Sequence, residues 1–360
     1  MMPVVMAILA ILMMQEVART APSGDTPFPR RERLTQEDGF LNKGKVFQFP
    51  SADGVTLLSS IRFDHPASRG MVIVVNGRAE SWLKYGELFR DLYRSGYSVA
   101  SYDHRGQGLS PRSGAGDPAA GKIDRPRLYS GDLDAFVKAL GNPGPGGFLL
   151  LAHSMGATAA LGAIEDHPAT FRAVALSAPM AEINTSPWPT AMVPLLTGGL
   201  CMTGQGGRYA PGEHAHDPSE PFSGNRLTSD RVRWGAMQAV WNRHPFAVLG
   251  GPSNEWVYRI MSWTGQIRGR AATVRTPVLI LVAGKDQLVR NEASRRLMRR
   301  IPGALMLEFP ESRHEILMEC DSVRSPALRE ILRFFARTSP IGLDRQLGNG
   351  HSSGATSPHS

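Results

Sequence analysis

One stretch near the middle of the chain restricts the fold more than any other. The apolar run Phe148–Leu151 predicts a buried strand, and the alanine-rich segment Ala157–Ile164 predicts a helix directly after a short turn. Ser154 lies at the apex of that turn, where backbone N–H groups of the helix N-terminus surround it. The usual pattern is G-x-S-x-G, and Ala152 replaces its first glycine with one extra methyl group. The stretch favours a serine nucleophile; the alternative is a serine that caps the helix.

Strands and helices alternate on both sides of this turn. Short apolar runs predict buried strands, and residues 85–93 repeat apolar side chains at helical spacing before Gly96. Such alternation predicts an α/β fold, a mostly parallel central sheet with helices on both faces. Residues 46–63, with Asp53-Gly54 in the middle, predict a hairpin before it. The remaining predicted strands are Met71–Val75, Tyr97–Tyr102, Ala173–Ser177, Pro277–Val282 and Leu305–Phe309, and the remaining helices are Leu133–Leu140, Ala293–Ile301 and a last one with Pro326 in its first turn.

The alternation stops between residues 181 and 272. This segment is rich in tryptophan, proline and glycine, and contains helix-like pieces such as Asp230–Asn242, which predicts an inserted, mainly helical lid. We therefore expect five parts along the chain. They are an apolar N-terminal segment and loose arm (1–43), a first core part (44–180), the lid (181–272), a second core part (273–337) and a disordered tail (338–360).

Two further residues complete the chemistry that Ser154 needs. A serine hydroxyl requires a base, and the base requires an orienting carboxylate. In this architecture the order along the chain is serine, then acid, then histidine. Asp286 follows a late strand, and His314 lies between the last strand and the final helix. We predict that His314 is the base and Asp286 its orienting acid; the alternatives are a turn aspartate and a surface-loop histidine.

An oxyanion hole requires two backbone N–H groups. One is expected from Met155, directly after the nucleophile, and the other from Arg78, in the loop after strand Met71–Val75. Losing one such donor typically costs about 3 kcal/mol of transition-state stabilisation. The Arg78 side chain faces either an anionic group or solvent. Glu80 is expected to shape the loop. Alternation is expected to turn the His153 side chain away from the site, so that it packs beside the serine turn.

Two other polar motifs are not expected to take part in the reaction. Asp103–Ser110 follows a strand and contains glycines that permit a tight turn, so Asp103 and Arg105 are expected to tie loops together. His214–Asp217 has histidines and an acid, but no further ligand has convincing spacing. We therefore expect no metal and no cofactor.

The composition narrows the possible partners. The net charge is +8 and the pI about 9.8, which favours anionic partners such as acidic lipid headgroups. The arginines are scattered and no nucleic-acid-binding motif is present, so nucleic acid is not expected as a partner. Two cysteines, Cys201 and Cys320, make no disulfide framework and are compatible with a reducing compartment.

With these residues identified, the chain resembles the bacterial lysophospholipases of the α/β-hydrolase superfamily, next to the monoacylglycerol lipases. The resemblance extends from about residue 50 to 337. It is carried by Asn76–Ser81, Asp103–Gly108, Ala152–Gly156, Ser177–Met180, Gly250–Pro252 with Trp256, and His314–Glu319 running into Arg324-Ser325. It implies the α/β-hydrolase fold, triad roles for Ser154, Asp286 and His314, and acyl-chain contacts in the lid.

The expected function is that of a serine hydrolase that cleaves carboxylic esters of single-chain lipids through an acyl-enzyme. The first substrate class is lysophospholipid, giving a free fatty acid and a glycerophospho-alcohol. The alternatives are a monoacylglycerol lipase, a general carboxylesterase, a serine aminopeptidase or a non-catalytic binding protein of the same fold. The lid and the basic surface also suit peripheral contact with an anionic membrane. The substrate-binding residues remain unassigned.

The beginning of the chain leaves three interpretations open. Pro3–Met14 is continuously apolar but shorter than the roughly 20 residues that span a bilayer. It is a signal-peptide core, a weak membrane-surface anchor, or residues added by an early start codon. We expect a protein in the cytoplasm or peripheral to the inner membrane, with secretion as the alternative.

Overall fold

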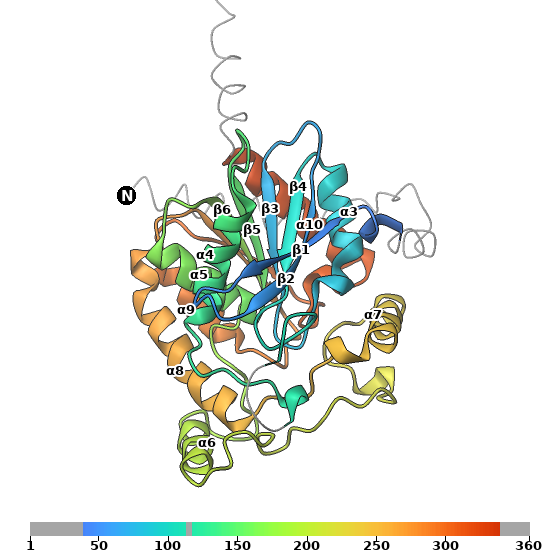
Figure 1. Cartoon of the computed structure of the whole chain (residues 1–360). Helices are drawn as coiled ribbons and strands as arrows, with labels where there is room; N and C mark the ends of the chain where they lie inside the picture. Colours follow the sequence, from blue (N-terminus) through green and yellow to red (C-terminus); the bar gives the residue numbers. More distant parts are fainter. Residues whose placement is uncertain (1–38, 113–116, 339–360) are drawn as a thin grey trace, which may run out of the picture.

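The computed structural model describes residues 39–112 and 117–338, and its centre is one eight-stranded sheet (Figure 1). The strands follow one another across the sheet in the order β1-β2-β4-β3-β5-β6-β7-β8. β2 pairs antiparallel with β1 and β4, and all other neighbours are parallel, which confirms the mostly parallel sheet. The strands are β1 Lys45–Pro50, β2 Leu57–Phe63, β3 Met71–Val75, β4 Ser98–Tyr102, β5 Phe148–His153, β6 Phe171–Ser177, β7 Val278–Ala283 and β8 Leu305–Phe309.

Helices cover both faces of this sheet. Along β5, alternate residues enter different cores: Leu150 packs with α4, α5, α8 and α9, whereas Leu149 and Leu151 pack with α3 and α10. This explains why the central strands are apolar throughout. The helices are α3 Gly86–Arg94, α4 Leu128–Leu140, α5 Met155–Asp166, α6 Met192–Met202, α7 Arg231–Arg243, α8 Asn254–Arg270, α9 Asn291–Arg300 and α10 Asp321–Arg337.

The predicted start of the last helix is wrong. α10 begins at Asp321, so Pro326 lies inside the helix and not in its first turn. A proline normally disfavours helix before it, because it lacks an N–H group and its ring crowds the preceding turn. Here the preceding turn is held by Arg324, which donates to the Leu317 carbonyl at 2.9 Å and lies 2.8 Å from the Asp91 carboxylate.

The segment predicted as a lid contains α6, α7 and α8; in Figure 1 α6 lies below the sheet, α7 at the lower right and α8 along the left flank. α8 packs on α5, and its Trp256 and Trp263 belong to the main core. α7 is joined to the core by Arg233, which contacts Glu87 of α3 at 2.7 Å and Asp321 of α10 at 2.6 Å. The boundaries of the five parts stay a prediction, and residues 1–38 and 339–360 lie outside the described residues.

Candidate active site

Ser154 lies on a strained turn between β5 and α5. Its backbone has φ 53° and ψ −117°, a region that residues other than glycine rarely adopt. A Cβ at Gly156 would overlap the Asn76 carbonyl oxygen and lie 2.7 Å from that of Val75, so position 156 requires glycine. Ala152 is accommodated fully buried within β5. Alanine therefore fits at position 152, as the sequence predicts.

The three residues predicted as a triad form one hydrogen-bonded row. His314 Nε2 lies 2.9 Å from Ser154 Oγ, and His314 Nδ1 lies 2.7 Å from Asp286 Oδ2. The other carboxylate oxygen of Asp286 accepts the backbone N–H groups of Leu288 and Val289, at 2.8 and 3.1 Å. The acid therefore cannot rotate away without losing two hydrogen bonds. This order is the one a serine nucleophile needs: hydroxyl, imidazole, carboxylate.

The electrostatics of the row suit a base. Burial by itself would lower the pKa of His314, but the Asp286 carboxylate outweighs burial and raises that pKa above 6.5. Burial would raise the pKa of Asp286, but His314 and the backbone donors hold it below 3.8. Asp286 is therefore ionised at neutral pH. His314 is left to exchange a proton with Ser154 Oγ.

The loop that begins at Asn76 lies against Ser154. A Cβ at Gly77 would be 3.1 Å from Ser154 Cβ, and the Gly77 N–H donates to the Glu80 carboxylate. The Gly77 N–H is thereby directed away from the nucleophile. Arg78 follows it, and Met155 opens α5 on the other side of Ser154. An oxyanion hole made by the N–H groups of Arg78 and Met155 stays a prediction.

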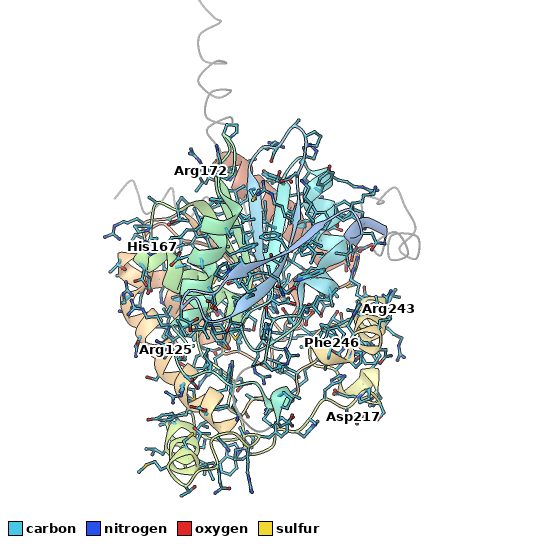
Figure 2. The ribbon with its side chains drawn as sticks, viewed as in Figure 1. Arg125, His167, Arg172, Asp217, Arg243 and Phe246 are labelled. Atoms are coloured by element: carbon cyan, nitrogen blue, oxygen red, sulfur yellow. The ribbon has the colours of Figure 1, made fainter. Side chains whose placement is uncertain are left out.

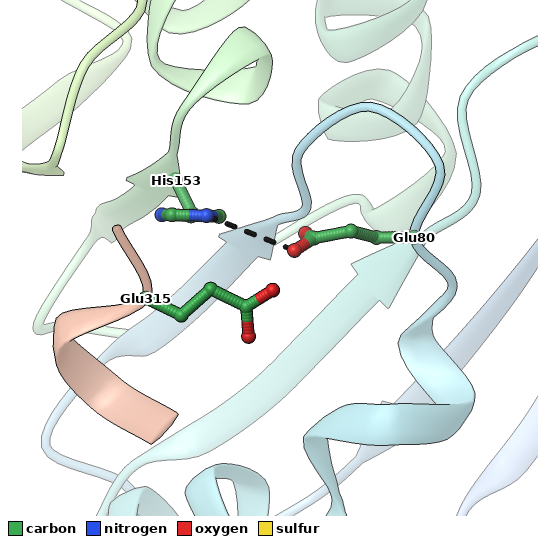
Figure 3. A group of neighbouring side chains, drawn as sticks. All are labelled: Glu80, His153 and Glu315. Atoms are coloured by element: carbon green, nitrogen blue, oxygen red, sulfur yellow. Dashed lines mark ion pairs between the residues drawn. The ribbon is translucent and has the colours of Figure 1, made fainter. Parts of the chain in front are cut away.

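Beside His314 lies a buried polar cluster made of Lys84 and the three residues drawn in Figure 3, which are Glu80, His153 and Glu315. The Lys84 ammonium donates to both carboxylates, to Glu315 Oε1 at 2.9 Å and to Glu80. The Tyr85 hydroxyl donates to Glu80 Oε2 at 2.7 Å. Glu80 shapes the loop as expected, because it binds Gly77 and Lys84 at once.

His153 packs beside the serine turn as expected, but the expectation that its side chain turns away from the site is wrong. Its ring centroid lies 4.7 Å from that of His314, and its Nε2 lies 3.7 Å from a Glu80 oxygen. His153 continues the alternation of Leu149 and Leu151 along β5, and the loop that carries His314 lies on that same face of the sheet. Burial lowers the pKa of His153 to about 3, so its ring is neutral.

The same cluster has the outline of a metal site. Ligand atoms of Glu80, His153 and Glu315 all lie within 4.8 Å of one another. The ammonium of Lys84 donates to both carboxylates, however, and so already supplies the positive charge that an ion would bring. These residues do not fit a metal.

The motif Asp103–Ser110 ties parts of the chain together, as expected. The buried Asp103 carboxylate accepts from the Ser81 hydroxyl and the Leu109 N–H, each at 2.7 Å. Arg105 joins helix α4 and the turn between β1 and β2, through Asp132 at 2.6 Å and Asp53 at 3.0 Å. These contacts hold the loops that carry the site, and none of them reaches Ser154 Oγ.

The sequence matches a known family and several known proteins. The family model described as serine aminopeptidase S33 matches residues 66–321. Lysophospholipase L2 of Escherichia coli is 34% identical over 292 residues, which cover 78% of this chain and 85% of that protein. The monoacylglycerol lipase of Mycolicibacterium smegmatis is 26% identical over 284 residues, covering 75% and 90%. The crystal structure of Paleococcus ferrophilus monoacylglycerol lipase superimposes with a TM-score of 0.60 at 24% identity, covering 78% and 99%. Among the described residues, no helix is long and apolar enough to cross a bilayer.

Proposed function

We propose lysophospholipid as the substrate, on the premise that the chain belongs to the serine aminopeptidase S33 family. As a lysophospholipase- and monoacylglycerol lipase-like α/β-hydrolase, it is a carboxylic-ester hydrolase of lipids. The observation that carries the chemistry is the row Asp286–His314–Ser154. The substrate class is supported by the likeness to lysophospholipase L2 of Escherichia coli. Release of a fatty acid from the glycerol ester is the proposed reaction.

The reaction follows from the geometry of the row. His314 Nε2 takes the proton of Ser154 Oγ as the oxygen attacks the ester carbonyl, while Asp286 stabilises the imidazolium. The N–H groups of Met155 and Arg78 bind the oxyanion. The C–O bond of the ester then breaks, and the alcohol leaves with the proton from Nε2. Water attacks the acyl-enzyme and gives a proton to Nε2. The bond from the acyl carbon to Ser154 Oγ then breaks, Nε2 returns the proton to Oγ, and the fatty acid leaves.

The second candidate is monoacylglycerol, which has the same ester and lacks the phosphate. The likeness to the Mycolicibacterium smegmatis monoacylglycerol lipase supports it, at lower identity than the lysophospholipase. The two candidates share every step at Ser154 and differ only in what the site must do with the headgroup.

We also propose that α6 touches the membrane surface from which the substrate comes. Residues 183–207 contain no Asp, Glu, Lys or Arg. On α6, Leu195 is 77% exposed and Met202 is 91% exposed, with Met192 and Leu196 beside them. The segment before α6 adjoins the Asp286 loop, where Arg290 donates to Thr190 Oγ1 at 2.9 Å. An uncharged helix so close to the catalytic acid suits an enzyme that draws a lipid out of a bilayer.

The exposed arginines support a general attraction to anionic surfaces. The exposed Arg125, Arg172 and Arg243 lie far apart over the molecule in Figure 2. This distribution favours loose attraction to acidic lipid over recognition of a nucleic acid.

The test is fatty-acid release by the wild-type protein and by Ser154→Ala. The substrates are a lysophospholipid and a monoacylglycerol with the same acyl chain, with an aminoacyl p-nitroanilide added for the peptidase alternative. Preferred release from lysophospholipid, lost in Ser154→Ala, is the expected result. Preference for the neutral ester would mean that monoacylglycerol is the substrate, with the same chemistry at Ser154. Release that survives in Ser154→Ala would overturn both.

A further inference from the structure

Arg78 is a partly buried cation beside the serine turn, and no acid of the described residues forms an ion pair with it. Its Nη1 donates to the Gly250 carbonyl at 2.9 Å, and its guanidinium lies 5.0 Å from the centre of the Trp256 ring. A longer contact of 3.4 Å reaches the Ala120 carbonyl, and the Nε is buried without a partner. The nearby Glu213 carboxylate is beyond ion-pair distance. The Arg78 side chain is partly buried with its Nε enclosed, so of the two environments expected from the sequence, open solvent is wrong.

Three other buried or partly buried arginines of the described chain each have an acid partner. Arg105 lies 2.6 Å from Asp132, Arg233 lies 2.7 Å from Glu87, and Arg324 lies 2.8 Å from Asp91. A charge withdrawn from water costs free energy unless an opposite charge accompanies it. Among residues 39–112 and 117–338, Arg78 makes no ion pair. Burial lowers its pKa to about 10, which leaves it positive at neutral pH.

The position of Arg78 relates this charge to the reaction. Arg78 follows Gly77, and a Cβ added at Gly77 would lie 3.1 Å from Ser154 Cβ. In a lysophospholipid, only the glycerol chain separates the ester carbonyl from the phosphate. A side chain that starts next to the nucleophile is therefore placed to meet the phosphate of an ester held at Ser154. A guanidinium binds phosphate through paired N–H donors, and Arg78 still has the Nε donor free.

We propose that Arg78 is the specificity-determining residue that binds the phosphate of the substrate headgroup. This inference rests on the proposed function, since it names what separates lysophospholipid from monoacylglycerol at the same site. Binding would exchange carbonyl contacts of Arg78 for charge-assisted hydrogen bonds to phosphate oxygens. A neutral glycerol ester gains nothing from this exchange.

A structural alternative makes Arg78 a tether between its loop and the insertion. Arg112 is a matched control for that role. It donates to the Phe246 carbonyl of the same insertion at 2.6 Å and to the Gly108 carbonyl at 3.1 Å, again with no ion pair in the described chain. Arg112→Met and Arg78→Met thus remove the same charge and the same kind of tether, but only Arg78 adjoins Ser154.

The measurement is the ratio of kcat/KM for lysophosphatidylglycerol to that for the monoacylglycerol of the same acyl chain. Arg78→Met is expected to lower the ratio by roughly 10- to 100-fold, the range for losing a hydrogen bond to a charged group. Arg78→Lys, which keeps charge but loses the planar fork, is expected to lower it less. Arg112→Met is expected to keep the wild-type ratio. An unchanged ratio in Arg78→Met, or an equal fall in Arg112→Met, would overturn the proposal.

A binding experiment separates this proposal from the proposed function. Calorimetry with glycerol 3-phosphate is expected to show binding to the wild type and to Arg112→Met, and at least tenfold weaker binding to Arg78→Met. Equal binding by all three overturns the role of Arg78, whatever the enzyme hydrolyses. Phosphate binding lost in Arg78→Met, without Ser154-dependent ester hydrolysis, would refute the proposed reaction and leave the anion site. Thermal unfolding of each variant establishes that it is folded, and Arg78→Lys serves if Arg78→Met is not.

Discussion

The Lys84 ammonium donates a 2.9 Å hydrogen bond to the carboxylate of Glu315, the residue that directly follows His314. It donates to Glu80 as well, so two buried carboxylates share one cation. The cluster therefore carries an excess of negative charge beside the imidazole. That charge adds to the effect of Asp286 in favouring the protonated form of His314.

Removing the shared cation should destabilise the fold. Lys84→Met leaves Glu80 and Glu315 buried without it, and we expect a loss of roughly 3–5 kcal/mol in the free energy of unfolding. Urea denaturation measures the loss. Lys45→Met is the control, because Lys45 pairs with Asp64 on the surface with 77% of its side chain exposed. An equal cost for both variants would mean that burial of the cluster is unimportant.

Neutralising Glu315 should change the pH dependence of the reaction. Only the neutral imidazole accepts a proton, so kcat/KM rises as the pH rises through the pKa of His314. The carboxylates of Asp286, Glu315 and Glu80 raise that pKa against the effect of burial. Glu315→Gln should therefore shift the acid limb of the pH profile to lower pH. Glu311→Gln, the same change at an exposed position of the same loop, should leave the limb in place.

Replacing the orienting acid should affect turnover far more than stability. In Asp286→Asn the side-chain oxygen can still accept from Leu288 and Val289, so the loop is retained. The amide nitrogen would donate to Nδ1 of His314, which places the ring proton on Nε2, where it cannot accept from Ser154. We expect kcat to fall by about ten-thousandfold with little change in Tm. Activity within tenfold of the wild type would show that Asp286 is not the orienting acid.

The two small residues around Ser154 should respond differently to a methyl group. Gly156→Ala places a Cβ against the carbonyl oxygens of Asn76 and Val75, which displaces the loop that carries Arg78. We expect a loss of roughly 1–3 kcal/mol in stability, with a fall in kcat. Ala152→Gly removes a methyl group that already fits within β5 and should retain most of the activity. Thermal unfolding and kcat distinguish the outcomes, and a tolerated Gly156→Ala would refute the steric argument.

Charging α6 should weaken binding to a lipid surface. Leu195→Glu introduces an acid on an exposed apolar helix face, and we expect reduced co-sedimentation with vesicles that contain anionic phospholipid. Turnover of a short, water-soluble ester should not change. Val55→Glu is the control, since Val55 is 84% exposed in the turn between β1 and β2. If both variants bind vesicles as the wild type does, α6 is not the contact surface.

Periodicity and chain order were sufficient to predict the sheet, the helices on both faces and the positions of Ser154, Asp286 and His314. These features depend on local patterns that a strand, a turn or a helix imposes on its own residues. The ion pair between Lys84 and Glu315 could not be predicted, because the two residues lie 231 positions apart and because lysine side chains are usually exposed. The contact of His153 with His314 also could not be predicted, since it depends on which face of the sheet the loop after β8 packs against.

The hydrogen bond between Ser154 and His314 spans 160 positions of the chain, with the whole insertion between β6 and β7 inside that interval. A chain emerging from the ribosome completes the strained serine turn long before it possesses a base or its acid. β7 and β8 must then close a long loop to reach β6, which is entropically slow. The nascent polypeptide is therefore unable to hydrolyse lipid until its last strands dock. Lipolysis would thus be a measure of complete folding.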